Sequence, residues 1–342
     1  ISIKIITGDY SETAANIAAQ VGMKGDLICM RGEEVMKMSD TALQEKVKNV
    51  NIFSRMFPDA KLKVIEALKT NGEIVAMTGD GVNDGPALKS AHIGIAMGEK
   101  GTEIARQASD LILTDDNLEK MVEAIEQGRK IFNNLKKAIR YIISIHIPII
   151  LTAALPLLLG WKYPNIFTPI HVIFLELIMG PTCSIFFERE PVETNLMLLP
   201  PRNRTEGLFR NDELLISIIQ GLIIATGIMT LYYIYMNNGY SLTETRTIVF
   251  TCLIISNIFL TFANRSFSST FLKTIHFKNN LAFPVIIISV LFLSLILWVP
   301  FVRNLFELSD ISSINLFICL GTAFISVAWF ELYKLRVKKL FL

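Results

Sequence analysis

The fold of this chain is decided by residues Glu73–Gly98, which read EIVAMTGDGVNDGPALKSAHIGIAMG. The stretch begins with a short apolar run, Ile74–Met77, whose length and composition are typical of one buried strand in a parallel sheet. The run stops at a turn that holds two glycines and two carboxylates, Asp80 and Asp84. A short helix is predicted next, and His92–Met97 then has the composition of a second buried strand. This strand–turn–helix–strand order predicts an α/β domain built on a parallel sheet.

The two carboxylates of the turn lie where an α/β sheet binds its ligands. Open parallel sheets place ligands at the carboxyl ends of their strands, and Asp80 and Asp84 follow the first of these strands directly. Carboxylates at that place can hold a Mg²⁺ ion that bridges phosphate oxygens. A lone Gly-Asp pair would more simply be a solvated turn. The longer string GDGVNDGPAL, in its strand–turn–helix context, favours the metal site.

The string GDGVNDGPAL resembles the hinge motif of P-type ATPases, ion pumps that are phosphorylated on an aspartate. The phosphorylation domain of this family has the haloacid-dehalogenase fold. The resemblance implies a partial phosphorylation domain of this α/β fold, with its stalk, over residues 1–137. It also implies ATP and Mg²⁺ as cofactors. Asp80 and Asp84 are then catalytic, with Asp80 as magnesium ligand and Asp84 as a second candidate ligand, and Asn83 faces the nucleotide or phosphate.

A second string, Thr7-Gly8-Asp9, follows the apolar run Ile1–Ile6, which we predict to be a strand. A helix is predicted after it, over Thr13–Val21. Taken alone, the string is an ordinary Thr-Gly turn followed by a helix cap. In P-type ATPases, a TGD string stands in the same order relative to the hinge motif. The resemblance therefore implies a catalytic hydroxyl on Thr7, and places all three residues of the string against nucleotide and phosphate.

Residues Ile52–Pro58 and the predicted helix Asp59–Thr70 resemble the FAR-x-x-P-x-x-K segment of the same family. Lys61 stands at the position of the family's lysine. A lysine there is a point charge that stabilises negative charge on the phosphoryl oxygens, so the resemblance implies that Lys61 is catalytic and binds phosphate. Arg55 matches the arginine that faces the nucleotide. Lys63, two residues beyond Lys61, is more simply a solvated side chain.

The second part of the chain is far more apolar than the first. The hydrophobic share of 51% is unevenly spread, and beyond Ile139 there are runs of about twenty apolar residues, enough to cross a bilayer as helices. We predict an all-α transmembrane domain over residues 138–342 with six helices. Their predicted bounds are about 139–160, 170–187, 212–236, 247–263, 281–302 and 313–332. Six spans after a hinge motif resemble the last six of the ten spans in type II pumps, the class of the calcium pumps.

Positive charges set the expected orientation of these spans. If the first span enters from the cytosol, the cytosolic loops and tail hold eleven Lys and Arg residues, and the opposite side holds three. The positive-inside rule then predicts a cytosolic soluble domain, with the lipid bilayer as a partner and the plasma membrane as the expected location. A basic run, Arg129–Arg140, precedes the first span. It is either a membrane anchor or, as the resemblance implies, the stalk that couples the phosphorylation domain to the ion site.

One acidic residue, Glu176, lies inside the first two predicted spans. A carboxylate at that depth is costly and by default marks an ion or proton site. Pro181 removes a helical hydrogen bond just after Gly180, and freed carbonyl oxygens there would add ligands for a hard cation. His146 and Pro148 suggest a comparable polar, broken midpoint in the facing span. We therefore predict that Glu176 and His146 bind the transported ion, with a hydrogen bond between helices as the alternative for His146.

The identity of the transported cation is left open. Calcium pumps of the type II class carry Asn and Glu in the first of these spans, where this chain has His146 and Ile149. In the next span they carry Asn, Thr and Asp, where this chain has Glu176, Met179 and Gly180. The calcium ligand set therefore does not carry over residue by residue. We expect at most one divalent cation per cycle, or a proton-linked or monovalent cargo in which His146 takes part.

Charge and cysteine content argue against some functions. The net charge of +2, without a basic patch that has interleaved aromatic residues, argues against a nucleic-acid partner. The four cysteines, Cys29, Cys183, Cys252 and Cys319, have neither metal-ligand spacing nor a disulfide-rich context. We interpret them as reduced packing residues.

Three features of an autophosphorylating pump are not found in this sequence: a D-K-T-G-T string, a nucleotide-binding insertion and an actuator domain with T-G-E. We therefore expect a C-terminal fragment that is inactive alone and has the N-terminal remainder of the same pump as its partner. Two alternatives are a membrane-tethered phosphatase of the haloacid-dehalogenase fold and a non-catalytic membrane module. An in-frame D-K-T-G-T upstream of Ile1 would favour the pump.

Overall fold

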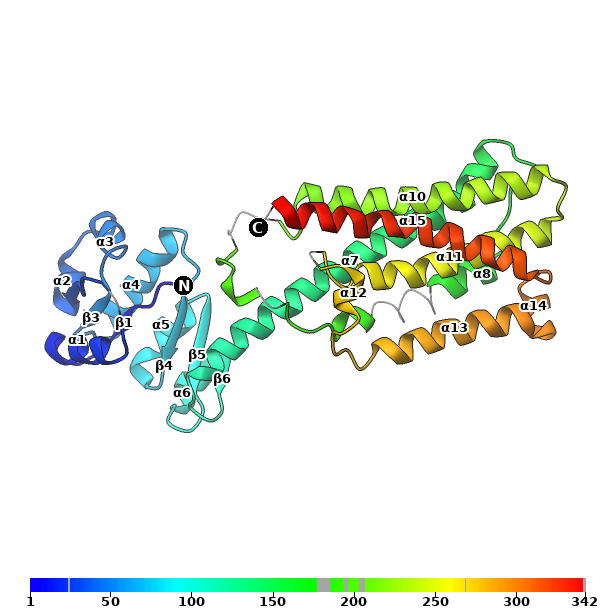
Figure 1. Cartoon of the computed structure of the whole chain (residues 1–342). Coiled ribbons are helices and arrows are strands. Elements are labelled where there is room, and N and C mark those ends of the chain that lie inside the picture. The colour runs from blue at the N-terminus through cyan, green and yellow to red at the C-terminus, as the bar shows by residue number, and fades with distance from the viewer. Residues whose placement is uncertain (24, 177–184, 194–195, 203–206, 268, 341–342) are drawn as a thin grey trace. The chain divides into compact units, whose positions relative to one another are not determined.

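The computed structural model describes residues 1–23, 25–176, 185–193, 196–202, 207–267 and 269–340 (Figure 1). These residues form two compact units. The first comprises Ile1–Ile125 and Leu198–Thr205, and the second comprises Glu126–Met197 and Glu206–Leu342. Each unit has a hydrophobic core of its own.

The first unit is an α/β domain with two three-stranded parallel sheets. One sheet has the strand order β1-β3-β2, and the other has the order β4-β5-β6. The elements, in chain order, are β1 (Ile5–Ile6), α1 (Ser11–Gln20), β2 (Cys29–Arg31), α2 (Gly32–Lys37), α3 (Asp40–Lys46), β3 (Ile52–Ser54), α4 (Pro58–Thr70), β4 (Ala76–Gly79), η1 (Val82–Asp84), α5 (Gly85–Ser90), β5 (Ile93–Met97), α6 (Glu103–Ala108) and β6 (Leu111–Leu113). Helices connect the strands, as parallel pairing requires.

Local sequence explains where several of these elements begin and end. α1 stops ahead of Gly22, whose φ of +76° suits glycine. α4 begins with Pro58, which has no N–H and so fits a first helical turn. Met77 of β4 and Ala96 of β5 lie in the same buried cluster as Val64 of α4. That cluster also contains residues of β2 and β3, so one core serves both sheets.

Both sheets have an edge without a strand neighbour among the described residues. β1 pairs with β3 alone, and β4 pairs with β5 alone. The prediction of parallel strands is confirmed, but they form two sheets rather than one. The first strand is shorter than the predicted Ile1–Ile6, and Ile1 and Ile3 lie exposed ahead of it. The segment 22–51, for which the sequence pattern predicted no element, contributes β2, α2 and α3.

The second unit is helical. Its elements are the greater part of α7 (Glu119–Leu158), most of η3 (Leu196–Leu198) and the whole of α8 (Pro169–Phe174), α10 (Asn211–Asn237), α11 (Leu242–Ala263), α12 (Phe271–Thr274), α13 (Ala282–Trp298), α14 (Pro300–Leu305) and α15 (Ser313–Leu340). In the described chain, α7, α10, α11 and α15 are long and apolar enough to cross a membrane, and α13 is a shorter apolar helix. The predicted span 170–187 falls partly outside the described residues. The count of six spans therefore stays a prediction.

α11 forms the centre of the second unit. It packs against α10, α13 and α15 (Figure 1). Most of its side chains are buried, among them Phe250 and Leu253. A helix that is apolar on all sides is stable when other elements enclose it. α11 begins at Leu242, ahead of its predicted start, because Ser241 and Glu244 form a capping box.

α7 runs without a break through Pro148 and Pro156, so the predicted broken midpoint at Pro148 is wrong. Pro148 still leaves the carbonyl of Ser144 without its helical donor, because proline has no N–H. α10 comes close at this point, since a Cβ on Gly221 would lie 2.8 Å from that carbonyl oxygen. The contact between α7 and α10 therefore requires a glycine.

Candidate functional site

The turns that follow β1 and β3 are joined at the carboxyl edge of their sheet. The hydroxyl of Thr7 donates to Oδ2 of Asp9 and accepts from the N–H of Asp9, both at 3.1 Å. The carbonyl of Thr7 accepts from the N–H of Met56 at 3.0 Å, and the carbonyl of Asp9 accepts from the N–H of Arg55 at 2.9 Å. Gly8 and Asp9 are exposed. The TGD string is therefore a solvent-facing turn that backbone hydrogen bonds hold to the turn after β3.

Arg55 has a backbone conformation that is unusual for a residue with a side chain. Its φ is +50°, in the left-handed region that favours glycine. Its carbonyl packs so closely on Gly32 that a Cβ there would lie 2.6 Å from the carbonyl oxygen. The guanidinium lies 4.8 Å from the centre of the Tyr10 ring. Strained residues of this kind often gather at ligand sites. Sequence reasoning missed Tyr10, although an aromatic residue directly after the TGD string was a usable signal.

The turn after β4 buries Asp84 and pairs it with Lys61. Asp84 is 6% exposed, and its Oδ1 accepts from Nζ of Lys61 at 2.6 Å. Lys61 lies in the first turn of α4, which follows β3, so this ion pair connects the carboxyl edges of the two sheets. Gly79 makes the packing possible, because a Cβ there would lie 2.6 Å from the Cβ of Asp84. The N–H of Gly81 also donates to Oδ2 of Asp84 at 3.4 Å.

Asp80 and Asn83 differ from Asp84 because both are exposed. The carbonyl of Asp80 accepts from the N–H of Thr102 at 2.8 Å, which fixes the turn, while its carboxylate has no side-chain partner among the described residues. Mg²⁺ is usually held by one or two protein carboxylates, with water and phosphate oxygens completing its shell. A free carboxylate on Asp80 near the fixed carboxylate of Asp84 fits that donor set. In the described part of the chain, no three His, Cys, Asp or Glu side chains gather to enclose a metal by themselves.

Lys63 does not belong to this site, and it is not the solvated side chain that was predicted. Its ammonium group donates to the carbonyl of Met38 at 2.7 Å and to that of Val35 at 3.4 Å. Lys63 therefore joins α4 to the end of α2. Lys61 and Lys63 lie on different faces of α4, because residues two positions apart on a helix do not point in the same direction.

In the second unit, the two residues predicted for the transported ion contact each other. Nε2 of His146 lies 3.1 Å from Oε2 of Glu176, and Nδ1 lies 2.8 Å from the carbonyl oxygen of Ile142. Since a carbonyl can only accept, Nδ1 carries a proton. The contact between Nε2 and the carboxyl oxygen needs one more proton, held by either the imidazole or Glu176. The predicted neighbours Gly180 and Pro181 lie outside the described residues.

A third polar residue of the helical unit was missed by sequence reasoning. Asn257 of α11 is 1% exposed, and neither atom of its amide has a hydrogen-bond partner in the described structure. A buried amide without a partner is costly, so its presence calls for a reason. Its oxygen is of the type that hard cations bind. The sequence did contain a signal for this residue, because Asn257 is the single amide side chain in the apolar stretch Ile254–Phe262.

The basic residues of α7 are tied to other parts of the second unit. Lys137 is buried and pairs with Glu193 at 2.8 Å, and Lys136 pairs with Glu213 at 2.7 Å. Asn134 donates to the carbonyl of Glu190 at 2.8 Å. α7 therefore holds both the segment after the predicted second span and the start of α10. All of these contacts lie within the second unit, so the choice between a stalk and a membrane anchor stays a prediction.

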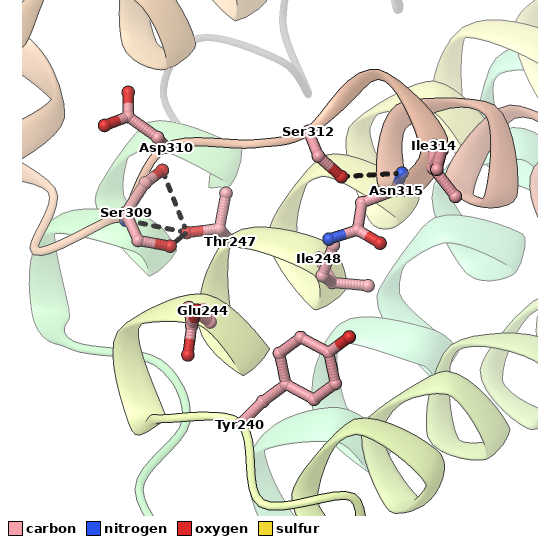
Figure 2. A pocket seen from close by; sticks show the side chains of 9 residues that line it. All are labelled: Tyr240, Glu244, Thr247, Ile248, Ser309, Asp310, Ser312, Ile314 and Asn315. Atoms are coloured by element: carbon pink, nitrogen blue, oxygen red, sulfur yellow. Dashed lines mark hydrogen bonds between the residues drawn. The ribbon is translucent and has the colours of Figure 1, made fainter.

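A polar cavity of about 350 Å³ lies at the start of α11 (Figure 2). It is lined by Tyr240, Glu244, Thr247, Ile248, Ser309, Asp310, Ser312, Ile314 and Asn315. Both carboxylates already have partners, since Glu244 accepts from the N–H and hydroxyl of Ser241 and Asp310 pairs with Arg303. The hydroxyl of Thr247 is likewise bonded to Ser309. The carboxylates and the Thr247 hydroxyl of this cavity are therefore engaged with other protein groups, and we assign no ligand to it.

Two family models match this chain. The model described as cation transporting ATPase, C-terminus, matches residues 164–336, and a haloacid dehalogenase-like hydrolase model matches residues 1–92. The first match covers about half of the chain, and the second covers the TGD string, Lys61 and the hinge motif. The resemblance drawn from the hinge motif and the predicted fold class are confirmed.

Three relatives give the same result. Calcium-transporting ATPase 1 of Yarrowia lipolytica is 33% identical over 315 residues, which cover 91% of this chain and 34% of the relative. Calcium-transporting ATPase 1 of Bacillus cereus is 35% identical over 319 residues, or 88% and 36% of the two chains. Calcium-transporting ATPase type 2C member 1 of Homo sapiens is 31% identical over 322 residues, or 94% and 35%. The chain spans about a third of the length of these relatives. Together with the long apolar helices, the matches support a multi-pass membrane protein.

Proposed function

Because this chain belongs to the family of cation-transporting ATPases, we propose that it forms the C-terminal part of an ATP-driven cation pump. The longer protein hydrolyses ATP through an aspartyl phosphate and couples that reaction to cation transport across a membrane. The observation that carries this proposal is the Lys61–Asp84 ion pair near the free carboxylate of Asp80, at the carboxyl edge of two parallel sheets. Residues 1–137 then belong to the phosphorylation domain and stalk, and residues 138–342 form the membrane domain.

The side chains at the sheet edges have separate roles. Asp80 is the magnesium ligand, and bound Mg²⁺ neutralises charge on the phosphate oxygens. Lys61 holds Asp84 in place and brings a positive charge toward the same oxygens, which stabilises the transition state. Thr7 redirects its hydroxyl proton from Asp9 to a phosphoryl oxygen when a phosphoryl group is present.

The residues that we expect to face the nucleotide are more exposed than Asp84. Gly8, Asp9, Arg55 and Asn83 all lie exposed in the turns that follow the strands. The guanidinium of Arg55 is held over the ring of Tyr10, which fixes a positive charge at the protein surface. This arrangement supports contact with ATP, whose phosphates are anionic and whose base is planar.

The partner that completes the site is the N-terminal remainder of the same pump. β1 and β4 each have an edge without a strand neighbour in the described chain, and both belong to parallel sheets. A strand of the remainder that pairs with both edges would join the two sheets into one. Its last residue would then stand at the carboxyl edge between Thr7 and Asp80, where the phosphorylated aspartate is needed.

The transported cation is bound by His146 and Glu176 in the membrane domain. The 3.1 Å contact between these two side chains supports a proton-linked or monovalent cargo, or a single divalent ion. Two calcium ions would need more charged oxygens than these two residues supply, because each prefers six to eight oxygen ligands. The names of the relatives describe calcium transport by those proteins alone.

Two substitutions in the full-length protein test the chemistry and the ion site separately. Asp80→Asn should abolish Mg²⁺-dependent phosphorylation from ATP, because it removes a charge from the metal shell with little change of shape. Glu176→Gln should abolish ion-stimulated ATPase activity but retain phosphorylation from inorganic phosphate, because that chemistry lies in the soluble domain. Both activities are measured across Ca²⁺, Mn²⁺, Mg²⁺, Na⁺, K⁺ and pH.

The same measurements separate the pump from the alternatives. Normal phosphorylation of Asp80→Asn, or normal ion stimulation of Glu176→Gln, contradicts the role of that residue. A stoichiometry of two Ca²⁺ per ATP contradicts the proposed cargo. A membrane-tethered phosphatase would hydrolyse phosphate esters without any ion stimulation. The plasma membrane stays a prediction, which fractionation of cell membranes checks.

A further inference from the structure

Two thiols meet in the core of the helical unit. Cys252 on α11 and Cys319 on α15 are free and fully buried. The thiol of Cys319 donates to the carbonyl of Ile248 at 3.5 Å, and the thiol of Cys252 approaches the carbonyl of Cys319 at 3.9 Å. Each thiol thus contacts a backbone carbonyl of the other helix, so both sulfur atoms lie in the interface of α11 and α15.

The surroundings of this thiol pair are apolar. Val249 and Leu253 of α11 and Ala323 of α15 are fully buried in the same cluster. Within the described ranges, no third His, Cys, Asp or Glu joins the pair to make a larger ligand group. A tetrahedral Zn²⁺ site needs four ligands. The thiol pair therefore suits a soft ion that is stable with two ligands.

We propose that Cys252 and Cys319 form a two-thiolate binding site for a soft divalent cation of the mercury(II) type. Binding replaces two S–H bonds by two S–metal bonds and releases two protons to water, so no electrons are transferred. The product is a linear S–Hg–S bridge with no net charge. Neutrality favours the divalent ion, because Cu⁺ between two thiolates leaves a negative charge, which is costly in an apolar interior.

The bridge links α11, the centre of the helical unit, to α15. The mercury bridge forms slowly compared with the reaction of Cys29, because Cys252 and Cys319 are buried and shielded from solvent while Cys29 is exposed. The site shares no residue with the proposed ATP and cation sites. The inference is therefore independent of the proposed function, and its test does not measure transport or hydrolysis.

The test uses HgCl₂ with the full-length protein in detergent micelles, followed by proteolysis and mass spectrometry. The unsubstituted protein should give a mercury-linked pair of peptides from α11 and α15, and the control Cys29→Ser should give the same pair. Cys252→Ala and Cys319→Ala should each lose the linked pair. Each alanine variant should also bind Hg²⁺ at least about 100-fold more weakly, because a second thiolate held beside the first raises the affinity by at least that factor.

Size-exclusion chromatography establishes that the variants are folded, and Cys252→Ser and Cys319→Ser replace the alanine variants if those aggregate. Release of mercury by a small dithiol, but not by an equal concentration of monothiol groups, supports two-thiolate binding. Mercury on single peptides only, or a linked pair that persists in Cys252→Ala, overturns the proposal.

Discussion

Replacement of Arg265 by alanine is expected to destabilise the helical unit strongly. Its partner Glu190 is 0% exposed. Oε1 of Glu190 accepts from Nε of Arg265 at 3.0 Å and from Nδ2 of Asn279 at 2.7 Å. The guanidinium also donates to the carbonyl of Phe277 at 3.1 Å. The substitution therefore leaves a buried carboxylate with one neutral donor.

The size of the expected loss of stability follows from the burial of Glu190. Removing one partner of a buried ion pair typically costs about 3–5 kcal/mol, because the other charge stays uncompensated. Oε2 of Glu190 has no partner in the described structure, so little else offsets the loss. The guanidinium also lies 5.4 Å from the centre of the Phe186 ring, and such a contact adds roughly 0.5–1 kcal/mol. For a unit of roughly 200 residues, a loss of this size lowers the unfolding midpoint by on the order of 10 °C.

The assay is thermal unfolding of the purified full-length protein in one detergent, followed by tryptophan fluorescence. Arg210→Ala is the matched control, since Arg210 pairs with Asp212 at the exposed surface and should cost less than about 1 kcal/mol. Adding Glu190→Gln to Arg265→Ala should restore part of the lost stability, because the buried charge is then removed. Equal shifts for Arg265→Ala and Arg210→Ala, or no recovery in the double variant, would refute the reasoning.

Three further substitutions test close contacts. Gly79→Ala places a Cβ 2.6 Å from the Cβ of Asp84, so it should displace that carboxylate and slow phosphorylation from ATP at least about tenfold, as measured by rapid quench. Lys61→Ala should slow the same step through weaker transition-state stabilisation, while nucleotide binding, measured by equilibrium dialysis, changes less. Gly221→Ala should lower stability by about 1–3 kcal/mol because α7 lies too close. Its control Gly321→Ala, with nothing within 4 Å, should be neutral or stabilise by up to about 1 kcal/mol in thermal unfolding.

The sequence by itself determined the elements whose signal is local. β4, its turn, α5 and β5 follow from two apolar runs separated by the hinge motif. α7, α10, α11 and α15 follow from long apolar stretches, because the length needed to cross a bilayer is a property of the chain alone. The family was also readable, since Thr7-Gly8-Asp9, Lys61 and GDGVNDGPAL stand in a fixed order along the chain.

Only the tertiary structure decided which side chains contact each other. The sequence assigned His146 and Glu176 to one site, and Lys61 and Asp84 to another, but it gave no pairing within either site. The contacts Lys61–Asp84, His146–Glu176 and Arg265–Glu190 join residues 23, 30 and 75 positions apart. The sequence contained signals for Tyr10 and Asn257, but the contact of Arg55 with the Tyr10 ring, the lack of a partner for the Asn257 amide among the described residues and the division of the strands into two sheets became visible only in the fold. A periodic pattern reports which face of an element is buried, but not which element covers it. Pairing of charges and strands depends on that packing, because hydrogen bonds and ion pairs form only between atoms that the fold brings within about 3–4 Å.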